Sequence, residues 1–287
     1  MLFIKFLRKE LKKLIFELIR RLNVFVIVWE LITLKMKTSW KIILQDIRNN
    51  MKRKTKLILI ISGSVLLLLI SGIFIYLNVY YKAVDVDNYL KSSDTVKVEE
   101  IKEGYMFDSA SDKALIFYPG AKVDTKAYAP LCFQMAEKGF DVFLLDMPFH
   151  FAIFDMNAAN DIIKNYSYSS YYVGGHSLGG AMAANYAAKN ASKLDGLLLL
   201  AAYPTKDLSS TDLTVLTIYG ENDGVLNRNK IETGRTLMPK DSYEYEINGG
   251  NHAQFGSYGK QKNDNDATIS SKVQIEETIG FIVKHFN

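Results

Sequence analysis

The chain is poor in cysteine and histidine: its 287 residues include one cysteine, Cys132, and four histidines. A single cysteine excludes a disulfide within the chain and a metal site built from several cysteines. Cys132 lies in a segment of helical pattern, where we expect a small core residue. The acidic residues Asp264 and Asp266 lack the spacing of an EF-hand loop. We therefore expect no metal and no cofactor.

Acidic residues are scarce in the first part of the chain. Residues 1–56 contain 15 Lys and Arg against 4 Asp and Glu, whereas the remainder contains 20 basic and 27 acidic residues. The overall net charge of +4 thus combines a basic end with an acidic body. An acidic body argues against a nucleic-acid partner, because phosphates attract surfaces rich in Lys and Arg.

Charge is absent from residues 57–81, a run of 25 residues that is long enough to span a bilayer with some tilt. The basic segment 51–56 precedes it, and Tyr76, Tyr80 and Tyr81 stand at its far end like an interfacial aromatic belt. The positive flank predicts a single-pass anchor in the cell membrane, with a cytoplasmic N-terminus and an extracytoplasmic body.

A cleaved signal peptide is the alternative interpretation of this run. The apolar region of a signal peptide is usually shorter, and residues 78–84 offer no small-residue cleavage site. We therefore expect an uncleaved anchor.

Residues 1–50 allow two interpretations. Phe3 and a series of leucines up to Leu22 recur at helical spacing with Lys and Arg between them, a pattern typical of a basic amphipathic helix on an anionic membrane. Alternatively, Met51 begins a complete positive-then-apolar anchor by itself, and residues 1–50 are an over-extended start. The apolar stretch 22–34 is too short to span a membrane.

Residues 82–94 are polar and mixed, which predicts a linker, and residues 95–287 form the body. Short apolar or alternating runs in the body predict strands, and amphipathic or Ala-rich runs predict helices between them. The predicted strands are 95–100, 114–118, 141–145, 171–174, 196–201, 214–219 and 243–247; the predicted helices are 128–138, 158–165, 179–189, 229–237 and 270–285. This alternation predicts an α/β fold with a mostly parallel sheet covered by helices on both faces.

The motif Gly175-x-Ser177-x-Gly179 lies between a predicted strand and an Ala-rich helix. Strand, sharp turn with a central serine, and helix form the context of a nucleophile elbow. The turn is so tight that side chains two residues either side of the serine would clash, which accounts for the glycines. Ser177 is therefore the candidate nucleophile.

A serine hydroxyl needs a base to take its proton. His176 is adjacent to Ser177 and cannot align for that transfer, and His285 lies in the last predicted helix. His150 follows a strand and is a possible pocket residue. His252 lies in a glycine-rich loop at the carboxyl end of strand 243–247, the sheet edge where sites form. We predict that His252 is the base.

The imidazole in turn needs a carboxylate to fix its tautomer. Asp223 follows strand 214–219, and Glu221 is its nearest competitor. The chain order Ser177, Asp223, His252 matches the order expected after an elbow of this kind. We predict Asp223 as the third member.

An oxyanion in the transition state needs two N–H donors. We predict that Leu178, directly after the nucleophile, supplies one. Ala121, in the loop after strand 114–118, is predicted to supply the other, with Gly120 as the alternative.

The body resembles the α/β-hydrolase superfamily, and in particular small bacterial membrane-anchored α/β hydrolases of unassigned substrate. The resemblance rests on residues 117–123, 146–149, 174–183 and 249–256 and does not extend to 1–50. It implies hydrolysis at an acyl carbon, although members of the superfamily also act on other bonds. The group often has asparagine where this chain has His150, so a shared pocket polarity is not implied there.

The segment between strands 196–201 and 214–219 is too short for the helical cap of many relatives. The long loop 252–269 is the candidate cover instead. Possible pocket residues are Gly120, Phe149, His150, His176, Gln254 and Phe255.

These features predict a serine hydrolase of carboxylesterase type that acts on a small-molecule or envelope-derived acyl substrate. A peptidase or transacylase of cell-envelope material, or a catalytically silent binding domain, are the alternatives. The sequence does not indicate an oligomeric state.

Overall fold

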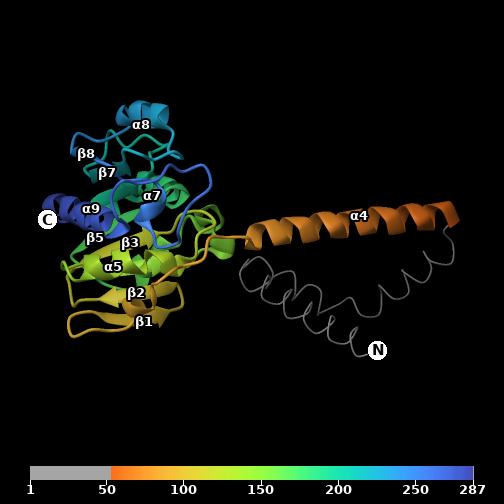
Figure 1. Cartoon of the computed structure of the whole chain (residues 1–287), viewed down its shortest axis with the longest axis horizontal. Helices are drawn as coiled ribbons and strands as arrows, with labels where there is room; N and C mark the ends of the chain where they lie inside the picture. Colours follow the sequence, from red (N-terminus) through yellow and green to blue (C-terminus); the bar gives the residue numbers. More distant parts are fainter. Residues whose placement is uncertain (1–52, 287) are drawn as a thin grey trace. The chain divides into compact units, whose positions relative to one another are not determined.

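The structure is a computed structural model that describes residues 53–286. The two interpretations of residues 1–50 therefore lie outside the described residues. The chain divides into two compact units, Met1–Leu77 and Asn78–Asn287. Each is described by itself (Figure 1).

The described part of the first unit is a single helix, α4 (Arg53–Asn78). Residues Thr55–Asn78 are long and apolar enough to cross a membrane, by length and composition. Most of their large apolar side chains are exposed. The expected span of 57–81 runs past the end of this helix at Asn78, so Tyr80 and Tyr81 belong to the second unit.

The second unit is built on a sheet of eight strands in the order β1-β2-β4-β3-β5-β6-β7-β8. The strands are β1 (Lys97–Ile101), β2 (Gly104–Asp108), β3 (Lys113–Tyr118), β4 (Asp141–Leu145), β5 (Ser170–His176), β6 (Gly196–Leu200), β7 (Thr214–Gly220) and β8 (Ser242–Ile247). The pairs β1–β2 and β2–β4 are antiparallel, and every other pair is parallel. The fold is an α/β-hydrolase fold with a mostly parallel sheet.

The central strands are apolar throughout because helices cover both faces of the sheet. Along β3, Leu115 and Phe117 contribute to the core on one face, whereas Ala114 and Ile116 contribute to the core on the other, as the two-residue period of a strand requires. All four side chains are at most 1% exposed.

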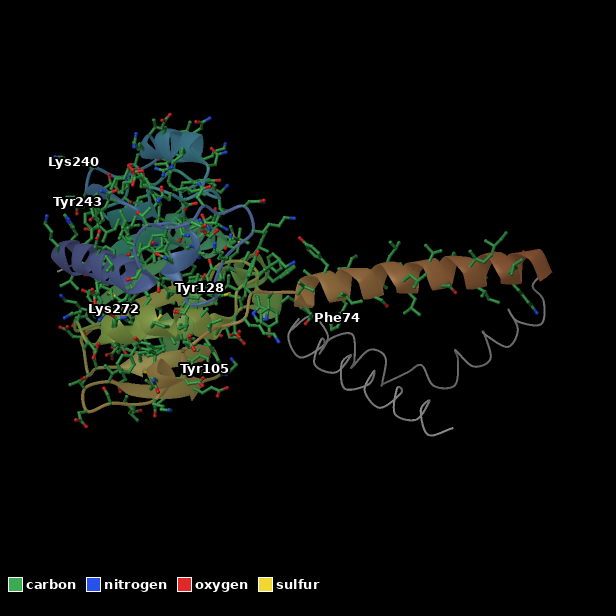
Figure 2. The ribbon with its side chains drawn as sticks, in the orientation of Figure 1. Phe74, Tyr105, Tyr128, Lys240, Tyr243 and Lys272 are labelled. Atoms are coloured by element: carbon green, nitrogen blue, oxygen red, sulfur yellow. The ribbon has the colours of Figure 1, made fainter. Side chains whose placement is uncertain are left out.

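The two faces carry different helices. Helices α5 (Ala129–Ala136) and α9 (Ser271–His285) contribute to the first core, and α6 (Ala159–Asn165) and α7 (Leu178–Asn190) contribute to the second. Helix α8 (Arg228–Arg235) lies beside β7 and β8 (Figure 1). The side-chain view contrasts the buried ring of Tyr128 with Lys240 and Lys272 at the surface (Figure 2). Cys132 of α5 is buried, as expected, and burial raises the pKa of its thiol.

Short 3₁₀ segments fill several connections. They span Asp87–Leu90, Thr125–Tyr128, Pro148–His150, Ala152–Asp155, Ala191–Lys193 and Ala253–Phe255. Only residues 201–213 connect β6 to β7, which leaves no room for a cap domain at that point.

The structure differs from the sequence-based expectation over 79–94. Tyr81 pairs with Val123 in a β-bridge, donates its N–H to Lys122 O at 2.7 Å and accepts the N–H of Asp124 at 2.8 Å. Val86 is buried, and the ring of Tyr89 meets Phe133 edge-on at 5.8 Å. The segment expected to be a linker, 82–94, is thus packed on the domain.

Candidate active site

Ser177 stands at the sharp turn between β5 and α7 with φ 54° and ψ −121°, a conformation that costs energy for a residue with a side chain. A Cβ atom on Gly175 would lie 2.4 Å from Tyr118 O, and one on Gly179 would lie 2.2 Å from the same oxygen. Only glycine fits at these two positions. Ser177 N–H donates to Leu200 O at 2.8 Å, which helps to hold the turn.

Two backbone N–H groups near the serine have no acceptor in the part of the chain that the structure describes. One is that of Leu178, the first residue of α7, whose N–H has no partner inside the helix. The other is that of Ala121. Its neighbours are engaged, because Gly120 N–H donates to Tyr128 Oη at 3.1 Å and Lys122 N–H donates to His150 O at 2.8 Å. Within this loop, Ala121 is therefore the residue with a donor to offer.

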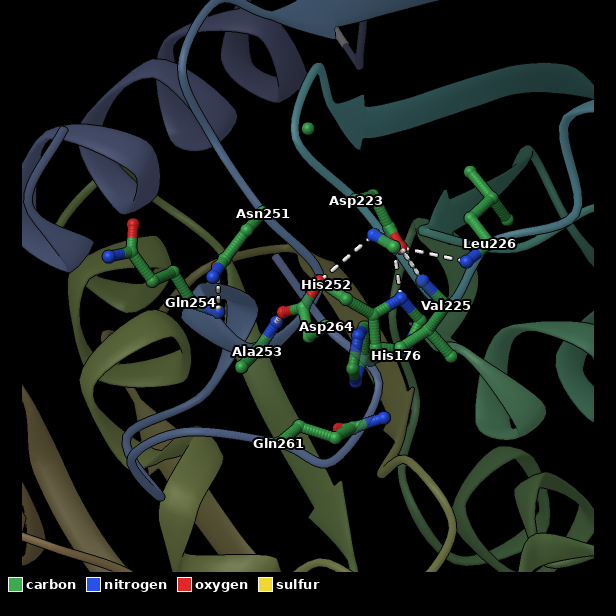
Figure 3. Close-up of polar contacts among 12 residues, drawn as sticks. His176, Asp223, Val225, Leu226, Asn251, His252, Ala253, Gln254, Gln261 and Asp264 are labelled. Carbon is green, nitrogen blue, oxygen red and sulfur yellow. Dashed lines mark hydrogen bonds and ion pairs between the residues drawn. The ribbon is translucent and has the colours of Figure 1, made fainter. Parts of the chain in front are cut away.

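Asp223 and His252 form a buried pair across the loops that follow β7 and β8 (Figure 3). His252 Nδ1–H donates to Asp223 Oδ2 at 2.8 Å, and both side chains are at most 2% exposed. A carboxylate only accepts, so the proton of this bond sits on Nδ1. In the neutral ring, Nε2 is then the nitrogen with a free lone pair.

The second oxygen of Asp223 fixes the carboxylate in place. Asp223 Oδ1 accepts the backbone N–H groups of Val225 at 2.8 Å and Leu226 at 2.7 Å. Glu221 is used differently, since its Oε2 accepts Gly249 N–H at 2.9 Å. Of the two carboxylates that sequence distance left in competition, the turn directs Asp223 to the imidazole.

The structure brings His252 close to the elbow without joining it to Ser177. His252 Nε2 is buried and makes no hydrogen bond to any described residue. The ring of His176, the residue before Ser177, lies 4.5 Å from the ring of His252 between centroids. Among the described residues, Ser177 Oγ thus makes no hydrogen bond to His252 Nε2.

His176 lies beneath the elbow and is 1% exposed. Burial, followed by the charge of His252, lowers the pKa of His176 well below its usual range, so its ring is neutral. Burial also raises the pKa of Tyr128, which therefore keeps its proton, and Tyr128 Oη shares a hydrogen bond with His176 Nδ1 at 2.7 Å. Because Tyr128 Oη also accepts Gly120 N–H, this pair ties the elbow to the loop that carries Ala121.

The remaining predicted pocket residues fall in several environments. Phe149 is buried with φ 54°. His150 has φ 59°, and its ring lies 3.8 Å from that of Tyr80 between centroids, with the two planes tilted by 34°. Phe255 is fully buried, with its ring 5.6 Å from that of His176. Gln254 donates through Nε2 to Ile269 O.

Gln254 also lines a cavity of about 760 Å³ between the 251–267 loop, α5, α9 and residues 84–89. The lining does not include Ser177, Asp223 or His252. Across residues 53–286, no three His, Cys, Asp or Glu side chains are grouped as a metal site would require.

Three residues around the site were not predicted as site residues. Tyr128 and Asp264 have no local sequence signal, because their partners are far away in the chain. Gln274 is a polar residue that is fully buried on the apolar side of α9. A polar residue among the apolar positions of an amphipathic helix is a feature that the sequence alone can reveal. Its side chain accepts Asn251 N–H at 2.9 Å and donates to Asn251 O at 2.8 Å, directly before His252.

Comparison with known proteins gives a family and a set of solved structures. Residues 114–276, more than half of the chain, match a family described as "Alpha/beta hydrolase family". No match was found among curated proteins.

Three solved structures are similar to the chain. A predicted CIB-like hydrolase from Thermoplasma acidophilum is 14% identical with a TM-score of 0.48, covering 66% of this chain and 99% of its own. Est1E from Butyrivibrio proteoclasticus, with ferulic acid bound, is 14% identical with a TM-score of 0.46, and the match covers 68% of this chain and 98% of Est1E. TT1662 from Thermus thermophilus is 12% identical with a TM-score of 0.49, and the match covers 67% of this chain and 98% of TT1662.

Proposed function

The chain belongs to the alpha/beta hydrolase family, and from that premise we propose that it is a membrane-anchored serine hydrolase of carboxylesterase type. Ser177 is the nucleophile, His252 the general base and Asp223 the residue that orients the imidazole. The observation that carries this proposal is the buried Asp223–His252 hydrogen bond, which holds the proton on Nδ1 and leaves Nε2 to act as a base.

The reaction proceeds in two halves. His252 Nε2 takes the proton of Ser177 Oγ while that oxygen attacks the acyl carbon, and the resulting oxyanion is received by the N–H groups of Leu178 and Ala121. The imidazolium then gives its proton to the departing alcohol, which leaves an acyl-enzyme. Water, activated by the same nitrogen, attacks the acyl-enzyme and releases the acid and the free serine.

The anchor is part of the proposal. Helix α4 supplies the membrane-spanning segment, in line with its length and apolar composition. The cluster of four basic residues within 52–56 supports a cytoplasmic N-terminus and a catalytic domain outside, where an ester or an envelope-derived acyl compound is the substrate.

The alternatives differ in the acceptor and in the bond that is cleaved. A peptidase or transacylase of envelope material would use the same three residues, so substrate profiling separates it from an esterase. A silent binding domain would not need the strained Ser177 or the Nδ1 hydrogen bond.

Labelling with a fluorophosphonate probe tests the proposal. We expect the full chain in detergent to be labelled. Ser177→Ala is expected to lose labelling and to hydrolyse small activated esters about 10³-fold or more slowly. The unaltered chain and the Ser177→Ala variant are expected to melt at similar temperatures. Ser170→Ala, at the start of the same strand, is the matched control and is expected to label like the unaltered chain. A folded Ser177→Ala chain with full activity would refute the proposed mechanism.

A further inference from the structure

Asp264 joins the two loops that carry the Asp223–His252 pair. Its Oδ2 accepts Ala253 N–H at 2.8 Å, and its Oδ1 accepts Gly224 N–H at 3.0 Å. Ala253 directly follows His252, and Gly224 directly follows Asp223. One carboxylate therefore bonds to the residue beside the proposed base and to the residue beside its proposed partner (Figure 3).

The loops approach each other closely at this point. A Cβ on Gly224 would lie 2.7 Å from Asn263 O and 3.0 Å from Asn265 N, so the turn after Asp223 and the loop 263–265 meet backbone to backbone. Asp264 Oδ1 also accepts Asn265 N–H at 3.0 Å, which orients the carboxylate. The side chain thus has three donors and little freedom to turn.

The segment 251–253 is held from a second direction. Gln274 of α9 makes two hydrogen bonds to the backbone of Asn251, and Asn251 Nδ2 donates to Asn265 O at 2.8 Å. Helix α9 therefore fixes the residue before His252, and Asp264 fixes the residue after it. The turn that carries Asp223 also meets this loop nearer the sheet, where Asn222 N–H donates to Gly250 O at 2.8 Å and Glu221 Oε2 accepts Gly249 N–H at 2.9 Å. Asp264 differs from these contacts because its partners, Gly224 and Ala253, directly follow Asp223 and His252.

We propose that Asp264 is a positioning residue, which holds Gly224 and Ala253 at a fixed separation and so aligns the hydrogen bond between the neighbouring residues Asp223 and His252. This rests on the proposed function for its effect on rate. It acts through backbone N–H groups and touches neither substrate nor the reacting atoms. A displacement of the imidazole by about 1 Å costs on the order of 100-fold in rate, so a small loop shift is sufficient.

The test compares Asp264→Asn with Asp266→Asn in the full chain. The amide introduced by Asp264→Asn keeps one acceptor oxygen but turns an NH₂ group toward an N–H donor, so one loop is released. Asp266, two residues later, is exposed and pairs with Lys260 at 2.5 Å, and it serves as the matched control.

The rate readout is fluorophosphonate labelling of Ser177. We expect Asp264→Asn to lower the maximal labelling rate on the order of 10- to 100-fold with probe affinity unchanged, and Asp266→Asn to change neither by more than about twofold. Asp264→Ala, which removes both acceptors, is expected to be at least as slow. Rates equal to that of the unaltered chain in both Asp264 variants would overturn the proposal, as would a loss that merely follows a lower melting temperature.

A second readout does not depend on activity. With ¹⁵N-labelled histidine, the chain has four imidazoles, and His252→Gln assigns the Nδ1–H signal of His252. We expect faster exchange of this proton with water in Asp264→Asn and unchanged exchange in Asp266→Asn. An unchanged exchange rate of the Nδ1 proton in Asp264→Asn contradicts the positioning role. If the exchange rate changes but the unaltered chain is never labelled at Ser177, only the proposed hydrolase activity is contradicted.

Discussion

Replacing Asp223 with asparagine is the most informative single change at this site. The two backbone N–H groups of Val225 and Leu226 already bind Oδ1, so the amide oxygen of the variant is expected to take that position. The NH₂ group then faces His252 Nδ1, where the carboxylate stood at 2.8 Å. Two donors cannot share one hydrogen bond, so the neutral ring moves its proton to Nε2 and accepts at Nδ1.

The consequence is a correctly folded site with the wrong tautomer. With a proton on Nε2, His252 cannot take the proton of Ser177, and an imidazolium no longer has a carboxylate beside it. A loss on the order of 10⁴-fold in kcat is expected, which corresponds to about 5 kcal/mol of transition-state stabilisation. Folding stability should change little, because the variant keeps the same number of hydrogen bonds in nearly the same volume.

Glu221→Gln is the matched control. Glu221 Oε2 accepts only Gly249 N–H among its described contacts, and an amide oxygen accepts that bond equally well in geometry. We expect kcat within about threefold of the unaltered chain, since one hydrogen bond to a charged acceptor is replaced by a neutral one. The assay is hydrolysis of a small activated ester at neutral pH, with melting temperatures measured for each variant. A damaging Glu221→Gln together with a mild Asp223→Asn refutes the reasoning.

Three further outcomes are expected. Gly179→Ala should destabilise the fold by about 1–3 kcal/mol or more, because its Cβ meets backbone at 2.2 Å, whereas Gly280→Ala, with open space in helix α9, should stabilise by up to about 1 kcal/mol in denaturant titrations. His176 stays neutral in the folded chain, whereas it takes up a proton in the unfolded chain below about pH 6.5. The free energy of unfolding should therefore fall as the pH drops below about 6.5, by up to about 1.4 kcal/mol per pH unit, and this fall should be smaller in His176→Gln. The same pH dependence in His176→Gln and the unaltered chain contradicts the lowered pKa of His176. Protease added to intact cells should digest the body, and digestion only after lysis reverses the proposed orientation.

The sequence determines the alternation of strands and helices because this information is local. Apolar runs such as 141–145 and 196–200 are buried on both faces, and the structure places strands there within a residue of the prediction. The elbow motif is equally readable from the local order of strand, serine and helix. The contact that requires glycine at 175 and 179 is with Tyr118 O of β3, however, and only the fold brings that oxygen there. The exception is β2, a five-residue strand that the sequence did not indicate and that makes the edge of the sheet antiparallel.

Tertiary structure decided the features that depend on contacts between distant segments. Glu221 and Asp223 are equivalent by distance along the chain, and only the shape of the turn gives one to Gly249 and the other to His252. Tyr81 lies 41 residues from Lys122, and its backbone pairing turns a polar segment that looks like a linker into part of the domain.

Asp264 shows the same limit most clearly. In the sequence it is one of two acidic residues in the loop 252–269, with nothing to distinguish it from Asp266. In the folded chain it accepts the N–H groups of Ala253 and Gly224, whereas Asp266 pairs with an exposed lysine. A backbone N–H is the same group at every position, so the sequence carries no mark of which one a side chain will meet. Only the packing of the loops around β7 and β8 decides it.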